Sequence, residues 1–225
     1  RDIVATGLGG KTLISTDVFC LANPNLSPLK LPTGCLPPDY ILKRVVLGVK
    51  DYGNRMGIPT NNGSLHFHDD FRAKPTVFVG AYGILPKKTA QIGIPKTGDL
   101  ILSIGGKVGR DGIHGATFSS AEMNDATINT NAQAVQIGNA IEEKRTFDAI
   151  AEAGDKNLIR AIQDCGGGGL SSAIGELGQN LGVDIQLKNA ALKYPGLSPW
   201  EIWLSESQER MILAISKNKL SQFKK

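Results

Sequence analysis

A run of four glycines, residues 166–169, follows an apolar segment that ends at Asp164 and precedes an amphipathic segment that starts at Leu170. A strand, a glycine loop and a helix in this order direct free N–H groups and the positive end of the helix dipole toward an anion. A flexible linker would have polar flanks. The Asp164 carboxylate would repel a phosphate unless a cation lay between them, and Mg²⁺ is commonly held by a carboxylate together with phosphate oxygens. The local sequence therefore favours a metal–phosphate site, with Gly167 and Gly168 as phosphate contacts, over a hinge.

A second glycine-rich loop, GGKVGRDGIHGATFSS, spans residues 105–120 and follows the apolar segment DLILSI. The bare backbone at Gly106 and the guanidinium of Arg110 suit a phosphate or another oxyanion. The same residues would also suit a tight turn that is closed by a pair between Arg110 and Asp111. Both interpretations stay open on the sequence alone.

A third group of polar residues, Glu206, Ser207 and Gln208, lies within LSESQERM, directly before an apolar segment. Three different hydrogen-bonding groups at the end of a strand suit a polyhydroxylated ligand such as ribose. They would equally serve to cap the strand at the surface. The local sequence does not decide between these two roles.

The elements that must position these residues follow from periodicity. Apolar residues at helical spacing predict a helix over 37–53, and β-branched and aromatic residues predict a largely buried strand over 76–85. Pro86 and two lysines mark a break. Further strands are predicted over 64–67, 99–104, 183–187 and 210–215, and another strand is predicted to end at Asp164. A helix is predicted to start at Leu170, with Leu181 on its apolar face. Strands and helices alternate after the break, which predicts α/β or α+β layers.

Composition excludes several classes of protein. The 225 residues carry a net charge of +4, and no basic face with interleaved aromatic residues is present, so nucleic acid is not an expected partner. No apolar run approaches the ~20 residues that span a bilayer, and no signal-peptide pattern is seen, so we expect a cytoplasmic protein without membrane contact. The three cysteines lack metal-site spacing. Because the chain begins with Arg1 instead of Met, we expect it to be part of a longer protein.

Four long motifs, taken together, resemble a known family. In chain order they are GGKVGRDGIHGATFSS, AVQIGNA, QDCGGGGLSSA and PWEIWLSESQERM, and YGNRMGIPT precedes them. They closely resemble the synthetase subunit of phosphoribosylformylglycinamidine synthase, an enzyme of purine biosynthesis, from Arg1 to about Ile215. The related aminoimidazole ribonucleotide synthetases usually have HITGGGL where this chain has QDCGGGGL, which favours the first family.

The resemblance implies a fold and a set of site residues. The fold is α/β (α+β), like that of aminoimidazole ribonucleotide synthetase: residues 1–86 would be the C-terminal part of a barrel-forming first domain and residues 87–225 a flanking α/β domain. The resemblance assigns Mg²⁺ to Asp2 and Asp164. It assigns the substrate contacts to Arg1, Gln136, Glu206, Ser207 and Gln208.

The resemblance also implies a reaction and partners. ATP would phosphorylate the amide oxygen of formylglycinamide ribonucleotide, and ammonia from a glutaminase subunit or domain would then displace the phosphate. A small accessory subunit is a further expected partner. The family's catalytic histidines lie upstream of the segment that matches Arg1, so we expect no catalytic residue in this chain and no turnover by it alone. Two alternatives are another ligase or kinase of the same superfamily and a non-catalytic ribonucleotide-binding module.

Overall fold

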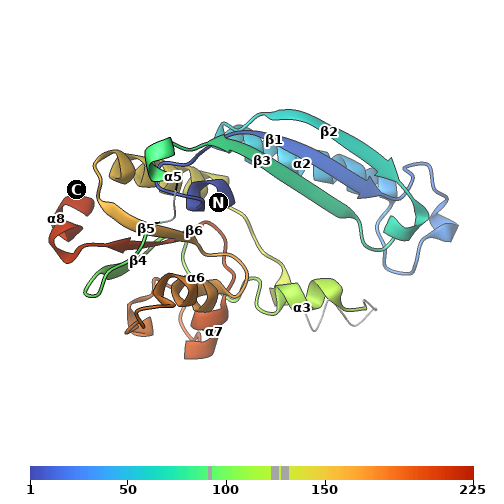
Figure 1. Ribbon diagram of the computed structural model, residues 1–225. Coiled ribbons are helices and arrows are strands. Elements are labelled where there is room, and N and C mark those ends of the chain that lie inside the picture. The colour runs from blue at the N-terminus through green and yellow to red at the C-terminus, as the bar shows by residue number, and fades with distance from the viewer. Residues whose placement is uncertain (91–92, 123–126, 128–131) are drawn as a thin grey trace. The chain divides into compact units, whose positions relative to one another are not determined.

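The computed structural model describes residues 1–90, 93–122, 127 and 132–225 (Figure 1). The chain divides into two compact units, one formed by residues 1–11 and 84–225 and the other by residues 12–83. No helix in the described part of the chain is long and apolar enough to cross a membrane. The helices and strands, in chain order, are α1 (Asp2–Ala5), β1 (Lys11–Leu21), α2 (Pro38–Met56), β2 (Thr60–Phe67), β3 (Thr76–Ile84), β4 (Leu100–Gly105), α3 (Gly115–Ser120), α5 (Ala140–Asp155), β5 (Ile159–Asp164), α6 (Gly169–Gly178), α7 (Pro199–Leu204), β6 (Arg210–Ile215) and α8 (Leu220–Phe223).

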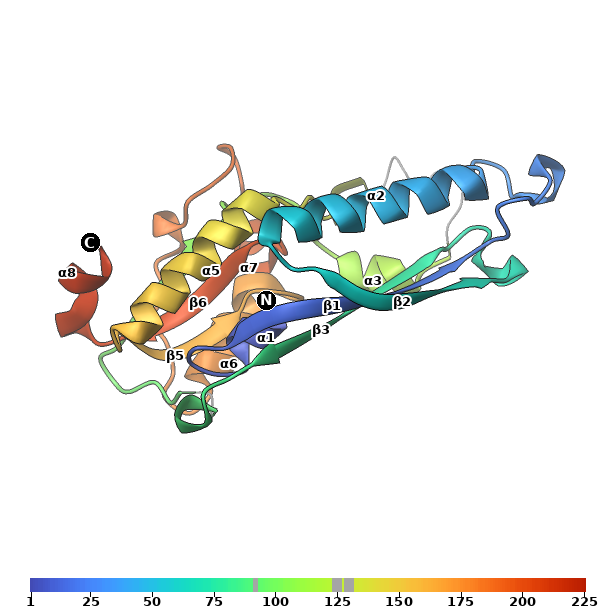
Figure 2. The same ribbon diagram turned by 90° about the horizontal axis from the view of Figure 1, so that it is seen from above.

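The unit of residues 12–83 is a three-stranded sheet with one helix on it. Its strand order is β2-β1-β3, with β1 and β2 parallel and joined through α2, which runs along one face of the sheet (Figure 2). The predicted helix is confirmed as α2, and it ends at Gly57 in the left-handed conformation that glycine adopts readily (φ 71°). Strand β1 was not predicted, because two residues of its buried face, Ser15 and Asp17, are polar and hide the alternation.

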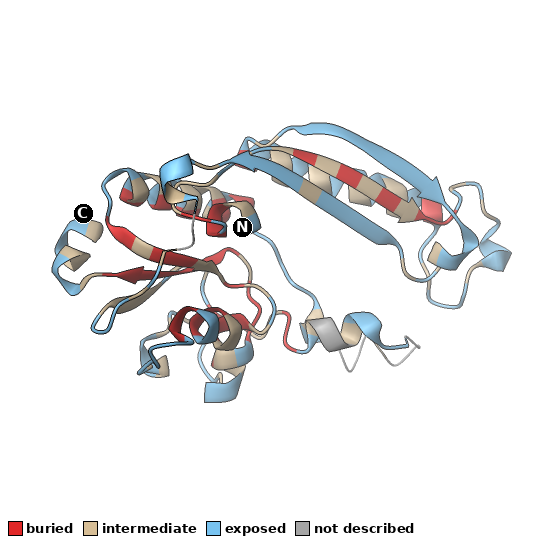
Figure 3. Cartoon of the chain, viewed as in Figure 1, coloured by how far each residue is buried: buried red, intermediate tan, exposed pale blue. Residues whose placement is uncertain are grey.

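Strand β3 shows that a run of apolar residues need not be buried. The predicted strand over 76–85 is confirmed as Thr76–Ile84. The expectation that it is largely buried is wrong, because every residue of the strand is exposed except Gly80, which is half-buried (Figure 3). The physical reason is its position at the edge of a sheet with three strands, where few neighbours cover it. The predicted strand over 64–67 is confirmed within β2, the other edge strand.

The unit of residues 1–11 and 84–225 is built in three layers around an antiparallel sheet of order β4-β6-β5. Every residue of the central strand β6 is buried. Because side chains alternate across a strand, Met211, Leu213 and Ile215 pack on the face covered by α1 and α5, and Ile212 and Ala214 on the face covered by α6 and α7 (Figure 1). The predicted strands near 99–104, 210–215 and up to Asp164 are confirmed, as is the layered α/β arrangement.

Two expectations about this unit are wrong. Helix α6 ends at Gly178, so Leu181 lies beyond it and is exposed. Residues 183–187 form no strand, and the last of them begins a short 3-10 helix, Leu187–Asn189. The alternation of Val183, Ile185 and Leu187 has a different cause, since Ile185 and Leu187 pack against the apolar cluster around α6 without pairing with a strand.

Candidate functional site

The carboxyl end of strand β5 is where the N-terminal residues meet the glycine loop. The Cys165 N–H donates to the Arg210 carbonyl at 3.1 Å, which continues the pairing of β5 with β6. Arg1 Nη1 donates to the Cys165 carbonyl oxygen at 3.0 Å, and α1 packs against β5. Arg1 therefore binds the residue directly after Asp164. Two residues predicted from distant parts of the sequence lie at one end of one strand.

The carboxylate of Glu206 binds two other predicted site residues, Gly168 and Gln136. Its Oε1 accepts a hydrogen bond from the Gly168 N–H at 3.0 Å, and its Oε2 accepts one from Gln136 Nε2 at 2.9 Å. Glu206 is 7 % exposed, whereas Gln136 is exposed. A carboxylate at the start of a helix is stabilised by the free N–H groups and by the helix dipole. The anion-binding geometry predicted for the glycine loop is thus present, and the protein's own Glu206 engages it.

Buried hydrogen bonds fix the other residues of the turn that carries Glu206. The fully buried Ser207 donates through Oγ to Asp111 Oδ2 at 2.6 Å and accepts from the Gly109 N–H at 2.8 Å. Gln208 Nε2 donates to the Glu206 carbonyl at 3.0 Å. The Ser207 hydroxyl is buried and fixes the turn, and the substrate contact predicted for Ser207 stays a prediction.

Asp111 is a supporting residue that the sequence did not reveal as such. Its carbonyl accepts from the Glu206 N–H at 3.0 Å, and its carboxylate binds Ser207 and Lys193. Partial burial would raise the pKa of the Asp111 carboxyl, but the hydrogen bonds from Lys193 and Ser207 hold that pKa below its ordinary value. The carboxylate stays charged and anchors the turn against the 105–120 loop.

Two of the predicted phosphate contacts are engaged within the protein. The Gly106 N–H donates to the Glu209 carbonyl at 2.9 Å. Arg110 Nε lies 2.5 Å from Glu201 Oε1, so Arg110 pairs with Glu201 and not with Asp111 as the tight-turn alternative supposed. Hydrogen bonds from Arg110 and from the Ser198 backbone and side chain lower the pKa of Glu201 to about 2. Gly106 and Arg110 therefore both have structural partners within the chain, and the phosphate contacts predicted for them stay predictions.

The four glycines differ sharply in what surrounds them. A Cβ atom at Gly169 would lie 2.1 Å from the Ser205 carbonyl oxygen, and both Gly168 and Gly169 have positive φ (76° and 61°). A Cβ at Gly167 would meet nothing within 4 Å, and Gly167 is exposed. Gly169 is required for the close approach of two backbone segments. Gly167 is the glycine at which a ligand can reach the backbone.

The two predicted metal ligands are carboxylates with different surroundings. Asp2 is exposed on α1, and Asp164 is half-buried at the end of β5. Among the described residues, no group of three or more His, Cys, Asp and Glu side chains is placed to hold a metal ion. Mg²⁺ is usually bound by one or two carboxylates and completes its shell with waters and phosphate oxygens. The donor set fits an ion that binds together with a phosphate better than a permanent structural metal.

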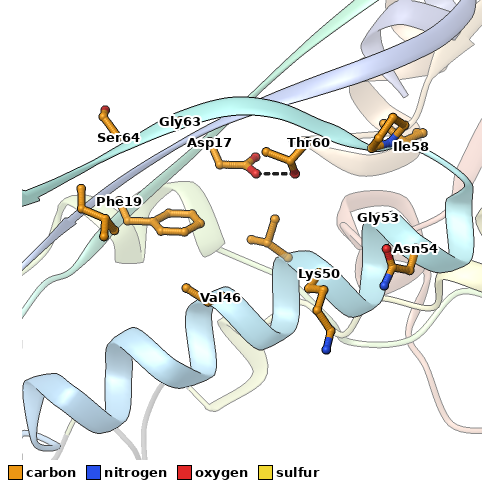
Figure 4. Close-up of a pocket in the computed structure, with 13 residues that line it drawn as sticks. Asp17, Phe19, Val46, Lys50, Gly53, Asn54, Ile58, Thr60, Gly63 and Ser64 are labelled. Carbon is orange, nitrogen blue, oxygen red and sulfur yellow. Dashed lines mark hydrogen bonds between the residues drawn. The ribbon is translucent and has the colours of Figure 1, made fainter.

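A separate groove lies in the unit of residues 12–83. It has a volume of about 700 Å³ and lies between α2 and strands β1 and β2, with Val46 and Lys50 on the helix side (Figure 4). Thr60 Oγ1 donates to Asp17 Oδ2 at 2.7 Å, while Oδ1 of this buried aspartate has no hydrogen-bond partner among the described residues. None of the predicted site residues lines this groove. It is therefore distinct from the cluster around Glu206.

Comparisons with known proteins agree with this architecture. Residues 96–225 match the family described as AIR synthase related protein, C-terminal domain, and residues 1–85 match its N-terminal domain. The phosphoribosylformylglycinamidine synthase subunit PurL of Picrophilus torridus is 41% identical over 234 residues, with 98% of this chain and 31% of that protein covered. The PurL subunit of Thermoplasma acidophilum is 43% identical over 222 residues, with 93% and 29% covered. The chain thus spans about a third of the relatives that it matches.

Solved structures show the same likeness. Thermotoga maritima PurL in complex with FGAR superposes with a TM-score of 0.80 at 30% identity, with 99% of this chain and 34% of that chain covered. T. maritima PurL in complex with ATP gives 0.74 at 28% identity, with 99% and 33% covered. The predicted fold and the predicted resemblance are both confirmed. The chain belongs to the AIR synthase-related protein family and is similar, over nearly its whole length, to part of the synthetase subunit of phosphoribosylformylglycinamidine synthase.

Proposed function

We propose that this chain binds and orients formylglycinamide ribonucleotide within an ATP-dependent ligase that converts it to formylglycinamidine ribonucleotide. The observation that carries the proposal is the junction of Gln136, Gly168 and Glu206 through one carboxylate. The similarity to PurL proteins, among them T. maritima PurL, which has been solved both with FGAR and with ATP, supports the choice of substrates.

In this proposal, Glu206 and Gln136 recognise the polar part of the ribonucleotide. A carboxylate only accepts hydrogen bonds, and a carboxamide both donates and accepts, so the pair can bind hydroxyl and amide groups in a fixed orientation. The Gln136 side chain is exposed and its partner Glu206 is nearly buried. A ligand therefore meets Gln136 first, and Glu206 determines the direction in which the amide points.

We assign the anionic part of the substrates to the end of β5. Asp2 and Asp164 would hold Mg²⁺, which neutralises phosphate charge and so lets a weak amide-oxygen nucleophile approach a phosphoryl group. Gly167 leaves the backbone open for a phosphate at the start of α6. Arg1, fixed on the Cys165 carbonyl, adds a positive charge beside Asp164.

The chemical steps require more than these contacts. In the proposed reaction, the amide oxygen of the substrate takes the terminal phosphoryl group of ATP, and ADP leaves. Ammonia then adds at the same carbon, inorganic phosphate leaves, and the amidine remains. The contribution proposed for this chain is orientation, which can account for several powers of ten in rate when a reaction is sensitive to geometry. A glutaminase subunit or domain, with a small accessory subunit, would supply the ammonia.

The proposal is tested by a matched pair of substitutions in a synthetase that contains these residues. Glu206→Gln removes the carboxylate that accepts from Gln136. Glu176→Gln makes the same change in an exposed pair of the same type, in which Glu176 on α6 accepts from Gln163 on β5. We expect Glu206→Gln to raise the KM for formylglycinamide ribonucleotide by about 10- to 100-fold, the equivalent of one hydrogen bond to a charged group, with the KM for ATP nearly unchanged. The Glu176 variant should behave like wild type. Equal effects of the two variants, or a change confined to ATP, would contradict the proposal.

A further inference from the structure

Arg210, the first residue of β6, is a charged side chain in the core. It is 0 % exposed, and its Nη1 is buried without a hydrogen-bond partner among the described residues. Burial lowers the pKa of its guanidinium, as expected for a cation removed from water. No carboxylate of the described residues lies within ion-pair distance of Arg210, although buried charges are ordinarily paired. Its burial therefore calls for a specific role.

The bonds that Arg210 does make all go to one turn. Its Nε donates to the Ser207 carbonyl at 2.8 Å, and its Nη2 donates to the Ser205 carbonyl at 2.5 Å. These two carbonyls flank Glu206 on either side along the chain. The planar guanidinium thus holds the peptide group directly before Glu206 and the one directly after Ser207, which fixes the backbone of the turn at both ends of the Glu206–Ser207 pair.

The same turn contains a second sign of constraint. Glu209 has a φ of 61°, an uncommon value for a residue other than glycine, and its Oε1 accepts from the Asn139 N–H at 2.7 Å. Asn139 lies three residues after Gln136. The turn is therefore tied both to the glycine loop, through Glu206, and to the segment that carries Gln136, through Glu209.

We propose that Arg210 is a positioning residue for ribonucleotide binding, which holds the turn of residues 205–209 so that the Glu206 carboxylate stays between Gly168 and Gln136. The effect on ribonucleotide binding rests on the proposed function. The effect of Arg210 on the position of the Glu206 carboxylate does not. The forked guanidinium is essential, because a lysine ammonium has the same charge but cannot hold two carbonyls at a fixed spacing.

The Gly168 amide reports on this geometry directly. Its N–H donates to Glu206, so its hydrogen-exchange protection in the 225-residue chain, measured by NMR, falls when the carboxylate moves away. We expect Arg210→Lys and Arg210→Met each to lower this protection by about tenfold, the equivalent of roughly one hydrogen bond. The Cys165 amide, which donates to the backbone carbonyl of residue 210, serves as an internal reference and should change less.

A matched control is present in the same sheet. Arg160, on β5, is paired with Asp99, and Arg160→Met removes a partly buried arginine without touching the turn. This variant should leave the Gly168 protection as in wild type. Thermal unfolding identifies any variant that fails to fold, and Arg210→Lys retains the charge in case Arg210→Met does not fold. Unchanged Gly168 protection in a folded Arg210 variant would overturn the inference, as would an equal loss in the Arg160 variant.

The link to function is measured separately, in a synthetase that contains these residues. We expect Arg210→Lys to raise the KM for formylglycinamide ribonucleotide about as much as Glu206→Gln does, with little change in kcat, and the double variant to be no worse than Glu206→Gln alone. Additive effects would show that Arg210 acts independently of Glu206 and would contradict the positioning role. If the wild-type synthetase does not respond to this substrate, the proposed function fails, while the exchange measurement still decides the role of Arg210 in the turn.

Discussion

At the residue scale, the glycine loop shows that four identical residues serve different purposes. Gly169 lies against the backbone of Ser205, and Gly168 donates to Glu206 from a left-handed conformation. Gly167 is exposed and has free space where a side chain would be. Sequence reasoning could identify the loop as an anion site but could not rank its glycines, since the contacts that distinguish them come from a segment almost 40 residues further along the chain.

This difference leads to a prediction about alanine substitutions. Gly167→Ala should change the free energy of unfolding by less than about 0.5 kcal/mol, as is usual for exposed positions, but should weaken binding of the phosphate-bearing substrates if these approach the backbone there. Gly169→Ala should destabilise the chain by more than about 1 kcal/mol, because a Cβ would clash with the Ser205 carbonyl and the φ is strained.

Denaturant unfolding and substrate titration of the two variants test this prediction together. A destabilised Gly167→Ala with normal binding would mean that the loop is only a turn. A fully stable Gly169→Ala would mean that the close approach to Ser205 is not required.

At the element scale, helix α7 is fixed at its start by Glu201. The Glu201 carboxylate accepts from the Ser198 N–H at 2.7 Å and from the Ser198 hydroxyl at 2.9 Å, and it pairs with Arg110. Serine before the helix and glutamate three residues later form a capping box. The helix thus links the 105–120 loop to the segment that leads into the 205–209 turn.

The low pKa of Glu201 predicts how this link depends on pH. The pKa falls from an ordinary value of 4.5 to about 2, so Glu201 stabilises the folded chain fully above pH 4.5, and this contribution is lost as the pH falls from 4.5 toward 2. We therefore expect wild type to be more stable than Glu201→Gln at neutral pH, and the difference to close between pH 4.5 and 2. Thermal midpoints measured across this range, with Glu122→Gln as an exposed control, provide the test. A difference that stayed constant with pH would contradict the assignment.

Also at the element scale, the sequence could predict elements with one clear face and could not predict those shaped by distant partners. Helix α2 and strand β6 have strong apolar patterns and were found. Strand β1 was missed because its buried face includes Asp17, whose partner Thr60 comes from another strand. The alternating residues at 183–187 predicted a strand, yet alternation alone does not provide a partner strand. Local pattern thus determines an element only where tertiary contacts agree with it.

The candidate site also contains both features that the sequence could predict and features that it could not. The glycine loop at the start of a helix could be predicted because it lies in one short motif, whereas the local sequence left the role of Glu206 open between ligand binding and capping of the strand. Arg110 could not be placed correctly, because Glu201, which engages it, lies 91 residues away. The support from Asp111 and Arg210 was also missed, since an arginine at the start of an apolar strand gives no sign of the carbonyls that it binds.

At the scale of the whole molecule, one compact unit is made of two separate segments of the chain. Residues 1–11 belong to the unit of residues 84–225, and Arg1 reaches the site at the end of β5. The domain boundary predicted at residue 86 separates Arg1 and Asp2 from that unit in sequence, although the fold joins them. It remains a prediction about domains of the family, distinct from the compact units of this chain.

The proposed function is tested most directly by the products that a synthetase containing these residues forms with ATP. The enzyme should be supplied with ammonium ions and, in separate reactions, with formylglycinamide ribonucleotide and with its amidine product. We expect ADP release and stoichiometric amidine formation with formylglycinamide ribonucleotide only. ADP release driven by the amidine instead would identify a cyclase of the same superfamily, and no release with either substrate would indicate a binding module. Either result would contradict the proposed function.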